Sequence, residues 1–252
     1  MSADGLRVAA VIVTHNSERF LPELIASIQG QTRAPDEVIA IDDSSTDQTT
    51  AMLQEAGWTV ETATSSATDV TTRVAQNFSQ GVRAARDFDF VVLGDHDDYW
   101  LPDRIEHQVH ELSVHPDAWL LASNGRIMGS HETLRDNFPV PQVWDEMSRA
   151  KRLRYALRHS IATGGASALR PKDLLNPSNK AVPMPEGWLH DRWWSLAATA
   201  QGAILLDPHP VIEYRVQGEQ QVGLNLGRQG TRAIKFLPGD AAKLRQVIRL
   251  LT

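Results

Sequence analysis

The alternation of apolar, strand-like runs with helix-like segments constrains the fold of this chain more than any other feature. Residues 7–14 read RVAAVIVT, a nearly continuous apolar run that is typical of a parallel strand covered on both faces. The first half is expected to contain strands at 7–14, 36–42, 58–63 and 87–94 and helices ending near Gln29, Ala56, Arg86 and Val114. Strand–helix–strand repeats join through right-handed crossovers, so the pattern predicts an α/β fold with a doubly wound, mostly parallel sheet flanked by helices.

Local signals mark several helix ends. Pro22 is expected in the first turn of the first helix and Gly30 just after its end, and Pro102 is expected to open the fourth helix. Ser45 and Gln48 have the spacing of a capping box, which predicts that the second helix begins directly after Ser45.

The second half of the chain is less regular. Strands are predicted at 118–123, 125–130, 161–169, 203–207 and 211–216, helices at 145–159 and 190–201, and loops at 131–144 and 176–187. We expect one domain over 1–230, with a smaller subregion in its second half, 99–230, and an amphipathic helical tail at 231–252.

Composition excludes several classes of function. The 252 residues include no cysteine, so disulfides, thiol nucleophiles and cysteine–zinc sites are excluded. The formal charge of −6 indicates that the surface as a whole is not built to hold a nucleic acid. No apolar run approaches the roughly 20 residues that span a bilayer, and MSADGLR does not resemble a signal peptide. We therefore expect a cytoplasmic protein.

Polar residues follow three of the predicted strands, where ligands of doubly wound sheets bind. These are the residues Thr14-His15-Asn16, Asp42-Asp43 and Asp95-His96-Asp97-Asp98. In an extended chain Asp95 and Asp97 share one face, and a divalent cation such as Mg²⁺ or Mn²⁺ converts the repulsion of two crowded carboxylates into binding. The alternative is an acidic loop that caps the next helix, with Asp103 in its first turn.

Two further aspartates have a functional and a purely structural interpretation. The Asp42 carboxylate could accept the ring N–H of uracil or thymine or bind ribose hydroxyls, or it could form an Asx turn that leads into the next helix. Asp191 lies in HDRWW, where aromatic neighbours would raise its pKa toward that of a general base. The alternative for Asp191 is a helix N-terminal aspartate beside core tryptophans.

Two segments could contact other molecules. The basic stretch at 149–155 could bind phosphate or an anionic surface, or be an ordinary exposed helix face. The apolar stripe of the tail could be docked core, an oligomer contact or a peripheral anchor at the inner face of a membrane; it comprises Leu244, Val247, Ile248 and Leu251.

Taken together, the motifs resemble the family-2 glycosyltransferases of the GT-A fold, especially the rhamnosyltransferase-like branch of bacterial polysaccharide synthesis. The resemblance runs from about Arg7 to Gly223. It is carried by VAAVIVTHN at 8–16, AIDDSSTDQT at 40–49, Asn-Phe at 77–78, GDHDDYWLPDRI at 94–105, TGGA at 163–166, HDRWW at 190–194 and YRVQG at 214–218.

The resemblance implies an inverting, metal-dependent transfer of sugar from a UDP- or dTDP-sugar to a saccharide or lipid-linked saccharide. It makes 1–98 the nucleotide-binding half and 99–230 the acceptor-side half. It implies Asp191 as catalytic base and Mn²⁺ or Mg²⁺ held by Asp97, Asp95 and Gln217. It implies donor contacts from Thr14, His15, Asn16, Asp42, Arg73, Asn77, Asp95 and His96. On the acceptor side it implies Gly164, Gly165, His190 and Trp193.

Two positions depart from the family pattern. Arg73 replaces a glycine that commonly precedes Asn-Phe, which would alter the base pocket or add a phosphate contact. Gln217 replaces a histidine, and because an amide oxygen is a weaker ligand for Mn²⁺ than imidazole, we expect the metal to bind loosely until the donor's diphosphate is present.

Two alternatives remain open at this stage. A sugar nucleotidyltransferase shares the sheet but should carry a glycine-rich N-terminal loop, and THNSERF at 14–20 contains no glycine. A glycosyltransferase-like protein that binds sugar nucleotides with little turnover is favoured by Gln217 and disfavoured by Asp191.

Overall fold

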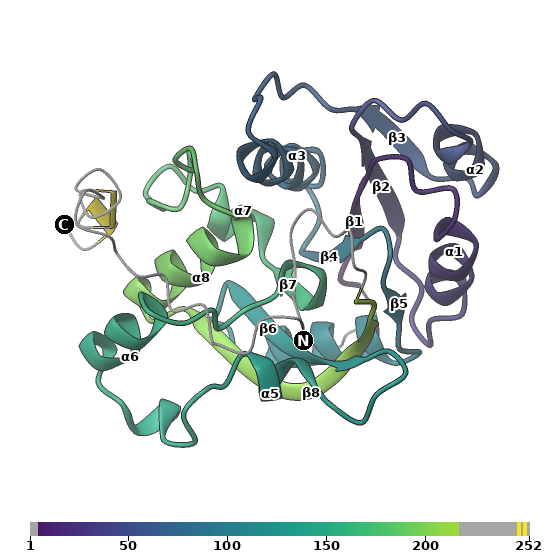
Figure 1. Ribbon diagram of the computed structural model, residues 1–252. Helices are drawn as coiled ribbons and strands as arrows, with labels where there is room; N and C mark the ends of the chain where they lie inside the picture. Colours follow the sequence, from purple (N-terminus) through teal and green to yellow (C-terminus); the bar gives the residue numbers. More distant parts are fainter. Residues whose placement is uncertain (1–4, 217–245, 248, 251–252) are drawn as a thin grey trace.

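A single eight-stranded sheet runs through both halves of the chain in the computed structural model, which describes residues 5–216, 246, 247, 249 and 250 (Figure 1). The strands are β1 (Val8–Thr14), β2 (Glu37–Asp42), β3 (Thr59–Thr62), β4 (Phe90–Asp95), β5 (Tyr99–Trp100), β6 (Leu120–Ile127), β7 (Ser167–Leu169) and β8 (Ile204–Tyr214). The α-helices are α1 (Leu21–Gln29), α2 (Thr49–Glu55), α3 (Val70–Ala84), α4 (Arg104–Val114), α5 (Leu134–Asn137), α6 (Arg149–Ala156), α7 (Pro171–Leu174) and α8 (His190–Gln201). Short 3-10 turns occupy η1 (Trp144–Glu146) and η2 (Gly164–Ala166).

The strand order is β3-β2-β1-β4-β7-β6-β8-β5. The four strands β3, β2, β1 and β4 are all parallel, and β6 pairs with β8 in parallel. β7 is antiparallel to both of its neighbours, and β5 is antiparallel to β8. This topology confirms the predicted α/β fold with a mostly parallel sheet flanked by helices.

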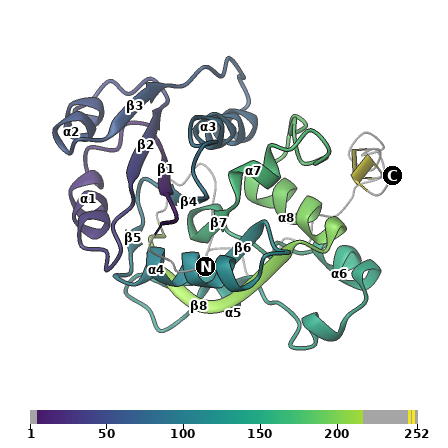
Figure 2. The same ribbon diagram turned by 180° about the vertical axis from the view of Figure 1, so that it is seen from behind.

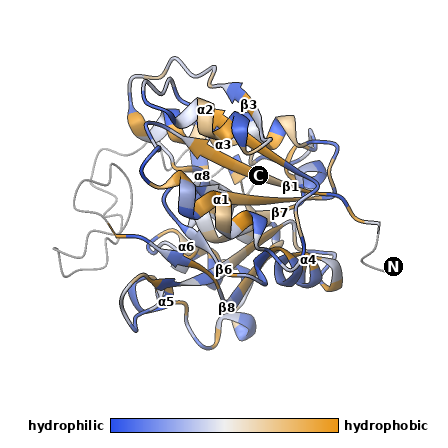
Figure 3. Ribbon diagram, turned by 90° about the vertical axis from the view of Figure 1, so that its right-hand side faces the viewer, coloured by the Kyte–Doolittle hydropathy of each residue, from blue (hydrophilic) through white to orange (hydrophobic). Residues whose placement is uncertain are grey.

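Helices cover both faces of the sheet and enclose two apolar cores (Figures 1 and 2). Alternate residues of β1 enter different cores, because successive side chains of a strand point to opposite faces. Val11 packs in the core that includes Phe78 of α3 and Trp193 of α8. Ile12 packs in the core that includes Leu24 of α1 and Ile105 of α4. Figure 3 shows the resulting hydrophobic strands inside a largely hydrophilic outer layer.

Two strands of the second half each join two predicted strands. The runs at 118–123 and 125–130 form one strand, β6, whose pairing with β8 shifts register on both sides of Asn124. The runs at 203–207 and 211–216 likewise form one strand, β8. Irregular pairing absorbs Asn124, Pro208 and Pro210 without ending either strand.

Three smaller predictions were wrong in detail. The helix expected at 145–159 is limited to α6, and the strand expected at 161–169 begins only at Ser167 because Gly164–Ala166 form a 3-10 turn. The capping box is absent, because the Ser45 hydroxyl donates to Asp42 Oδ1 at 2.6 Å instead. α2 therefore begins at Thr49, four residues after Ser45.

The described residues of the tail pack against the domain. Val247 and Leu250 are buried, and Gln246 Oε1 accepts a hydrogen bond from Trp188 Nε1 at 2.8 Å. The remaining stripe residues, and Gln217, lie outside the described residues. Among those described, no helix is both long and apolar enough to cross a membrane.

Gly81 allows α3 to approach the sheet closely. A Cβ atom at this position would overlap Val11 Cγ1 and lie 3.3 Å from Ile41 Cγ1. In a helix interior, alanine is normally more stabilising than glycine by about 1 kcal/mol, whereas overpacking a core costs about 1–3 kcal/mol.

We expect Gly81→Ala to lower the free energy of unfolding, measured by urea denaturation. Arg83→Ala, at an exposed site of the same helix, should change it by less than about 0.5 kcal/mol. A Gly81→Ala protein as stable as wild type would contradict this account.

Candidate active site

The carboxyl ends of three central strands lie at one level. Thr14 of β1 is paired with Asp42 of β2, and Val13 of β1 is paired with Asp95 of β4. The predicted polar ends of β1, β2 and β4 therefore meet at the same edge of the sheet, where a parallel α/β sheet binds its ligands.

Four aspartates, three from residues 95–98 and one from the start of α8, gather beside two glycines at this edge. A Cβ atom on Gly165 would lie 2.6 Å from Asp95 Oδ2 and 2.7 Å from Asp98 Oδ2. The Gly165 backbone N–H donates to Asp95, and the Gly164 N–H donates to Asp191, at the start of α8. Asp97 lies close enough for its charge to act on both Asp95 and Asp98. Only a glycine at position 165 leaves room for these carboxylates.

Burial and mutual repulsion make these carboxyl groups weak acids. Burial, followed by the charges of Asp97 and Asp191, raises the pKa of Asp95 to about 7. Burial, then Asp95 and Asp97, holds the pKa of Asp98 well above its usual range. Burial also raises the pKa of Asp191 to about 6. The site thus concentrates more negative charge than its buried surroundings can solvate.

One buried cation lies under the cluster. Arg104 of α4 donates to Leu93 O, and its guanidinium carbon lies 3.8 Å from the Trp100 ring centre. Burial lowers the pKa of Arg104 to about 9, while Asp98 and Asp95 act in the opposite direction. Arg104 is one of two buried arginines that act on the four carboxyl groups, since Arg192 acts on Asp191.

The convergence of the aspartates comes from a turn and not from an extended strand. β4 ends at Asp95, and residues 96 and 97 form a turn. The turn returns Asp98 to the side of Asp95, where both approach Gly165. The side chains of Asp95 and Asp97 were expected to converge because alternate residues of a strand share a face. The observed geometry is a turn, and the place of Asp98 beside Asp95 was not predicted.

The cluster fits a divalent cation that is completed by a ligand. Asp98 Oδ2 is buried and has no hydrogen-bond partner, and three carboxylates act on one another electrostatically. Among the described residues, no three His, Asp or Glu side chains form a complete metal site. Mg²⁺-type sites commonly combine one or two carboxylates with waters and substrate phosphates, so these carboxylates could supply part of such a site.

Asp42 organises the turn that follows β2. Its Oδ1 accepts from the Thr14 hydroxyl at 3.0 Å and from the Ser45 hydroxyl at 2.6 Å, and its Oδ2 accepts the Ser45 backbone N–H at 3.0 Å. These bonds form the Asx turn that was the alternative interpretation of the sequence. They fix the carboxylate at the floor of the site.

The next residue, Asp43, forms an ion pair that the sequence did not indicate. Arg73 Nε lies 2.7 Å from Asp43 Oδ2, with the two side chains 28% and 15% exposed. His15 Nδ1 lies 2.6 Å from the Asp43 carbonyl oxygen. The arginine that departs from the family pattern is therefore held by the residue that directly follows β2.

Asn16 and His96 occupy the space on either side of His15. Asn16 has a positive φ of 47°, and its Oδ1 accepts the Thr46 backbone N–H at 2.8 Å. Burial lowers the pKa of His96, with opposing effects from Asp97 and His15. His96 thus links the strand ends around His15 to the carboxylate cluster.

Three other residues named from sequence lie in the buried layer behind the site. The side-chain amide of Asn77, on α3, is fully buried and has no hydrogen-bond partner. His190 stacks on Phe78 with ring centres 3.9 Å apart, its Nε2 faces Gly164, and burial lowers its pKa to about 3. Trp193 donates through Nε1 to Ala181 O at 2.9 Å and belongs to the core, so the structure does not bring it to the carboxylates.

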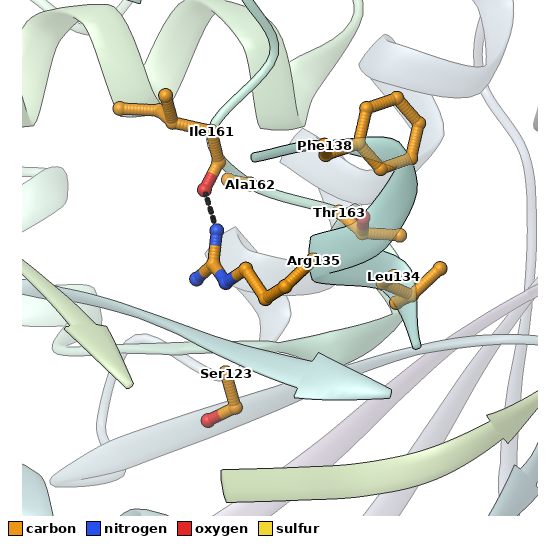
Figure 4. A pocket seen from close by; sticks show the side chains of 7 residues that line it. All are labelled: Ser123, Leu134, Arg135, Phe138, Ile161, Ala162 and Thr163. Atoms are coloured by element: carbon orange, nitrogen blue, oxygen red, sulfur yellow. Dashed lines mark hydrogen bonds between the residues drawn. The ribbon is translucent and has the colours of Figure 1, made fainter. Parts of the chain in front are cut away.

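Arginines that the sequence did not single out hold the surrounding loops. Arg135 donates to Ile161 O and to Ala122 O, both at 2.9 Å, beside a void of about 10 Å³ (Figure 4). Arg215, after β8, donates through Nε to Asp97 O at 3.0 Å. These bonds fix the segment before Gly164 and the turn that carries Asp97.

The raised pKa values predict how stability depends on pH. Asp95 has a folded-state pKa of about 7 against about 3.9 when unfolded. Protonation of Asp95 therefore favours the folded state, and this stabilisation is lost as the pH rises from about 4 through about 7.

We expect Asp95→Asn to raise the thermal midpoint of the metal-free protein at pH 8 but not at pH 4, by differential scanning calorimetry. Asp145→Asn, with a 96% exposed side chain, should change neither. Equal midpoints of Asp95→Asn and wild type at pH 8 would contradict the electrostatic account.

Comparisons with known proteins agree with this architecture. Among solved structures, S. aureus TarS 1-349 in complex with UDP is similar at 17% sequence identity and a TM-score of 0.59, covering 84% of this chain and 61% of that chain. Glucosyl-3-phosphoglycerate synthase from Mycobacterium tuberculosis, in complex with Mn²⁺, UDP and glucosyl-3-phosphoglycerate, has 20% identity and a TM-score of 0.57, covering 85% and 74%. The present chain thus spans about three fifths of the TarS structure. At such low identity these likenesses show the fold alone, which is the GT-A fold.

Sequence comparison gives the family. A search of curated proteins finds no match. The model of the family described as "Glycosyl transferase family 2" matches residues 9–175, which include the three strand ends and both glycines of the site but not Asp191. Because this match covers about two thirds of the sequence, the chain belongs to glycosyl transferase family 2.

Proposed function

We propose that this protein is an inverting, metal-dependent glycosyltransferase. It moves a sugar from a UDP- or dTDP-sugar to a hydroxyl of a saccharide or lipid-linked saccharide, in the synthesis of bacterial surface polysaccharide or glycoconjugate. The observation that carries the proposal is the position of Asp191, which shares one buried cluster with Asp95 at the carboxyl edge of the sheet. This proximity supports the proposal, because a base and metal ligands in one cluster can act on one substrate.

The donor's nucleotide is assigned to the ends of β1 and β2. This region contains Thr14, His15, Asn16 and Asp42, and Arg73 is bound to the neighbouring Asp43. Bound UDP in TarS and in the mycobacterial synthase supports the UDP alternative. The rhamnosyltransferase-like branch, which rests on the sequence motifs, keeps dTDP as the other.

Asp97 and Asp95 are assigned as protein ligands of the divalent cation, with Gln217 as a further candidate. When bound, Mn²⁺ or Mg²⁺ would offset the negative charge of the departing diphosphate. Mn²⁺ in the structure of the mycobacterial synthase supports this cofactor class. His96, on which the charges of Asp97 and His15 both act, is assigned to the donor side.

Asp191 is assigned as the general base. The Arg192 backbone N–H donates to its Oδ1 at 2.6 Å, and the Gly164 N–H also donates to it, so the carboxylate is held in one orientation. A pKa of about 6 leaves most of the group ionised at neutral pH while keeping it basic enough to accept a proton. The acceptor oxygen forms a bond to the anomeric carbon as the bond to diphosphate breaks, the acceptor's proton moves to Asp191, and the electron pair leaves with the diphosphate. A single displacement inverts the anomeric configuration.

The acceptor is assigned to the side of Gly164, Gly165 and α8, in the second half of the chain. We place the catalytic domain at 1–230, with the nucleotide-binding half at 1–98, and the protein in the cytoplasm. A binding protein with little turnover remains the second candidate, because Gln217 replaces the family's histidine. Donor hydrolysis or transfer, measured with wild-type protein, distinguishes the two.

Asp191→Asn should nearly abolish transfer, because a general base contributes roughly 10²–10⁴-fold to the rate. Donor affinity, measured by isothermal titration calorimetry, should stay within a few-fold, since the base acts in the transition state. NMR of the wild-type product should show the inverted anomer. Asp145→Asn serves as the control for loss of one surface carboxylate. Retention of configuration, or full activity of Asp191→Asn, would rule out the mechanism.

Asp97→Asn should weaken binding of UDP or dTDP in the presence of Mn²⁺, because the cation links this carboxylate to the diphosphate. In EDTA the variant and wild type should bind the nucleotide alike and weakly. Asp87→Asn, at an exposed position, should leave calorimetric binding unchanged under both conditions. Wild-type affinity that is the same with Mn²⁺ and with EDTA would remove Asp97 from the metal site.

A further inference from the structure

The helix α6 and the three residues after it concentrate positive charge in a chain that is otherwise acidic. Residues 149–159 read RAKRLRYALRH, with five arginines or lysines and no acidic residue. The whole chain has a net charge of −6, so the remainder carries −11 without this segment. A block of one sign within a protein of the other sign indicates a local binding surface.

The positive side chains point away from the core. Leu153 and Ala156 are the buried residues of α6 and pack in the core that contains α8. Lys151 and Arg154 lie on the side of α6 opposite Leu153 and Ala156, Arg158 lies in the turn that follows α6, and all three side chains are exposed. We call these three residues the cationic face. None of them forms an ion pair with another described residue.

Arg152 shows what a structural arginine looks like in the same helix. Its Nε donates to Trp144 O at 2.7 Å, its guanidinium also donates to Asp145 O, and the side chain is 24% exposed. The fold therefore uses one basic residue of α6 and leaves the cationic face available.

The cationic face is held rigidly beside the candidate active site. Arg192, next to Asp191 on α8, donates to Leu157 O at 3.1 Å and to His159 O, at the end of α6. Figures 1 and 2 both show α6 at the edge of the molecule, next to α8. Contact of a surface with α6 would therefore fix the orientation of the acceptor-side half of the protein relative to that surface.

An exposed apolar residue accompanies the cationic face. Val143 is 52% exposed and precedes Trp144, whose ring meets Tyr155 of α6 edge-on at 6.3 Å. Asp145 and Glu146 follow in the same turn and are exposed, which leaves a net charge of +3 over 143–159. Basic residues beside an exposed apolar side chain are typical of a contact with the surface of a bilayer.

We propose that the cationic face of α6 docks this protein on a membrane surface rich in anionic lipids. The three cations are spread from the middle of α6 to the turn after it, which suits several headgroups in a plane better than one phosphate. A nucleic acid is disfavoured because its other charges would face a surface of net −11. The apolar tail residues Val247 and Leu250 are buried, so α6 and not these residues makes the contact.

The proposal is tested by floating the full chain with vesicles of phosphatidylcholine, alone or mixed with phosphatidylglycerol. We expect flotation only with the anionic vesicles and release at high salt. The triple variant K151E/R154E/R158E should lose at least about 100-fold in partition coefficient, since each cation near an anionic surface contributes roughly fivefold. The triple variant R83E/R86E/K180E changes the net charge equally at other exposed sites and should keep binding.

Further arms identify the ligand. Thermal midpoints close to that of wild type will show that both triple variants are folded, and single reversals of Arg154 and Arg158 serve if the triple variant is not. Equal flotation of wild type and K151E/R154E/R158E, or no flotation of wild type, would overturn the proposal. Release by inorganic phosphate beyond that by chloride of equal ionic strength would instead indicate a phosphate site. Binding of a single-stranded oligonucleotide but not of vesicles would indicate a nucleic-acid partner, and both results also overturn it.

Discussion

The crowding of carboxylates around Gly164 and Gly165 is the constraint on which the rest of the structure depends. Three segments far apart in the sequence meet there, namely the turn after β4, the glycine pair and the start of α8. Gathering buried carboxylates is unfavourable in the absence of a cation. The two apolar cores on either side of β1, together with Arg104, must therefore hold the site against its own repulsion.

The fold could be predicted from sequence where one physical signal dominated. β1 is buried on both faces, so its unbroken apolar run identified a central parallel strand. The second half offered no such signal. Pro208 and Pro210 read as a break, yet β8 continues through them because its pairing with β6 is irregular there. Whether a proline ends a strand depends on which hydrogen bonds the neighbouring strand requires, and this information is tertiary.

The candidate site divides in the same way. Asp95, Asp97, Asp191 and the two glycines could be named from motifs, since each lies at a strand end, helix start or glycine turn. Asp98 could not, because its place beside Asp95 depends on the turn between them. The Asp43–Arg73 pair joins residues 30 apart, and only the packing of α3 on β2 brings them together. Trp193 was misleading for a related reason, since the resemblance of HDRWW to a family motif does not say which side of a helix surrounded by protein faces a ligand.

The charge distribution separates the carboxylate cluster of the candidate site from the cationic face. A nucleotide diphosphate is itself an anion, so it meets repulsion from the same carboxylates that would orient its cation. Under the proposed function, each of the two ligands would lower the cost of binding the other, and by linkage the effect of metal on nucleotide would equal that of nucleotide on metal. The cationic face of α6 does not relieve this repulsion, because it lies on the outer side of α6, away from the core that α6 shares with α8. Under both proposals, the cationic face would contact a surface without competing with the cation for the diphosphate.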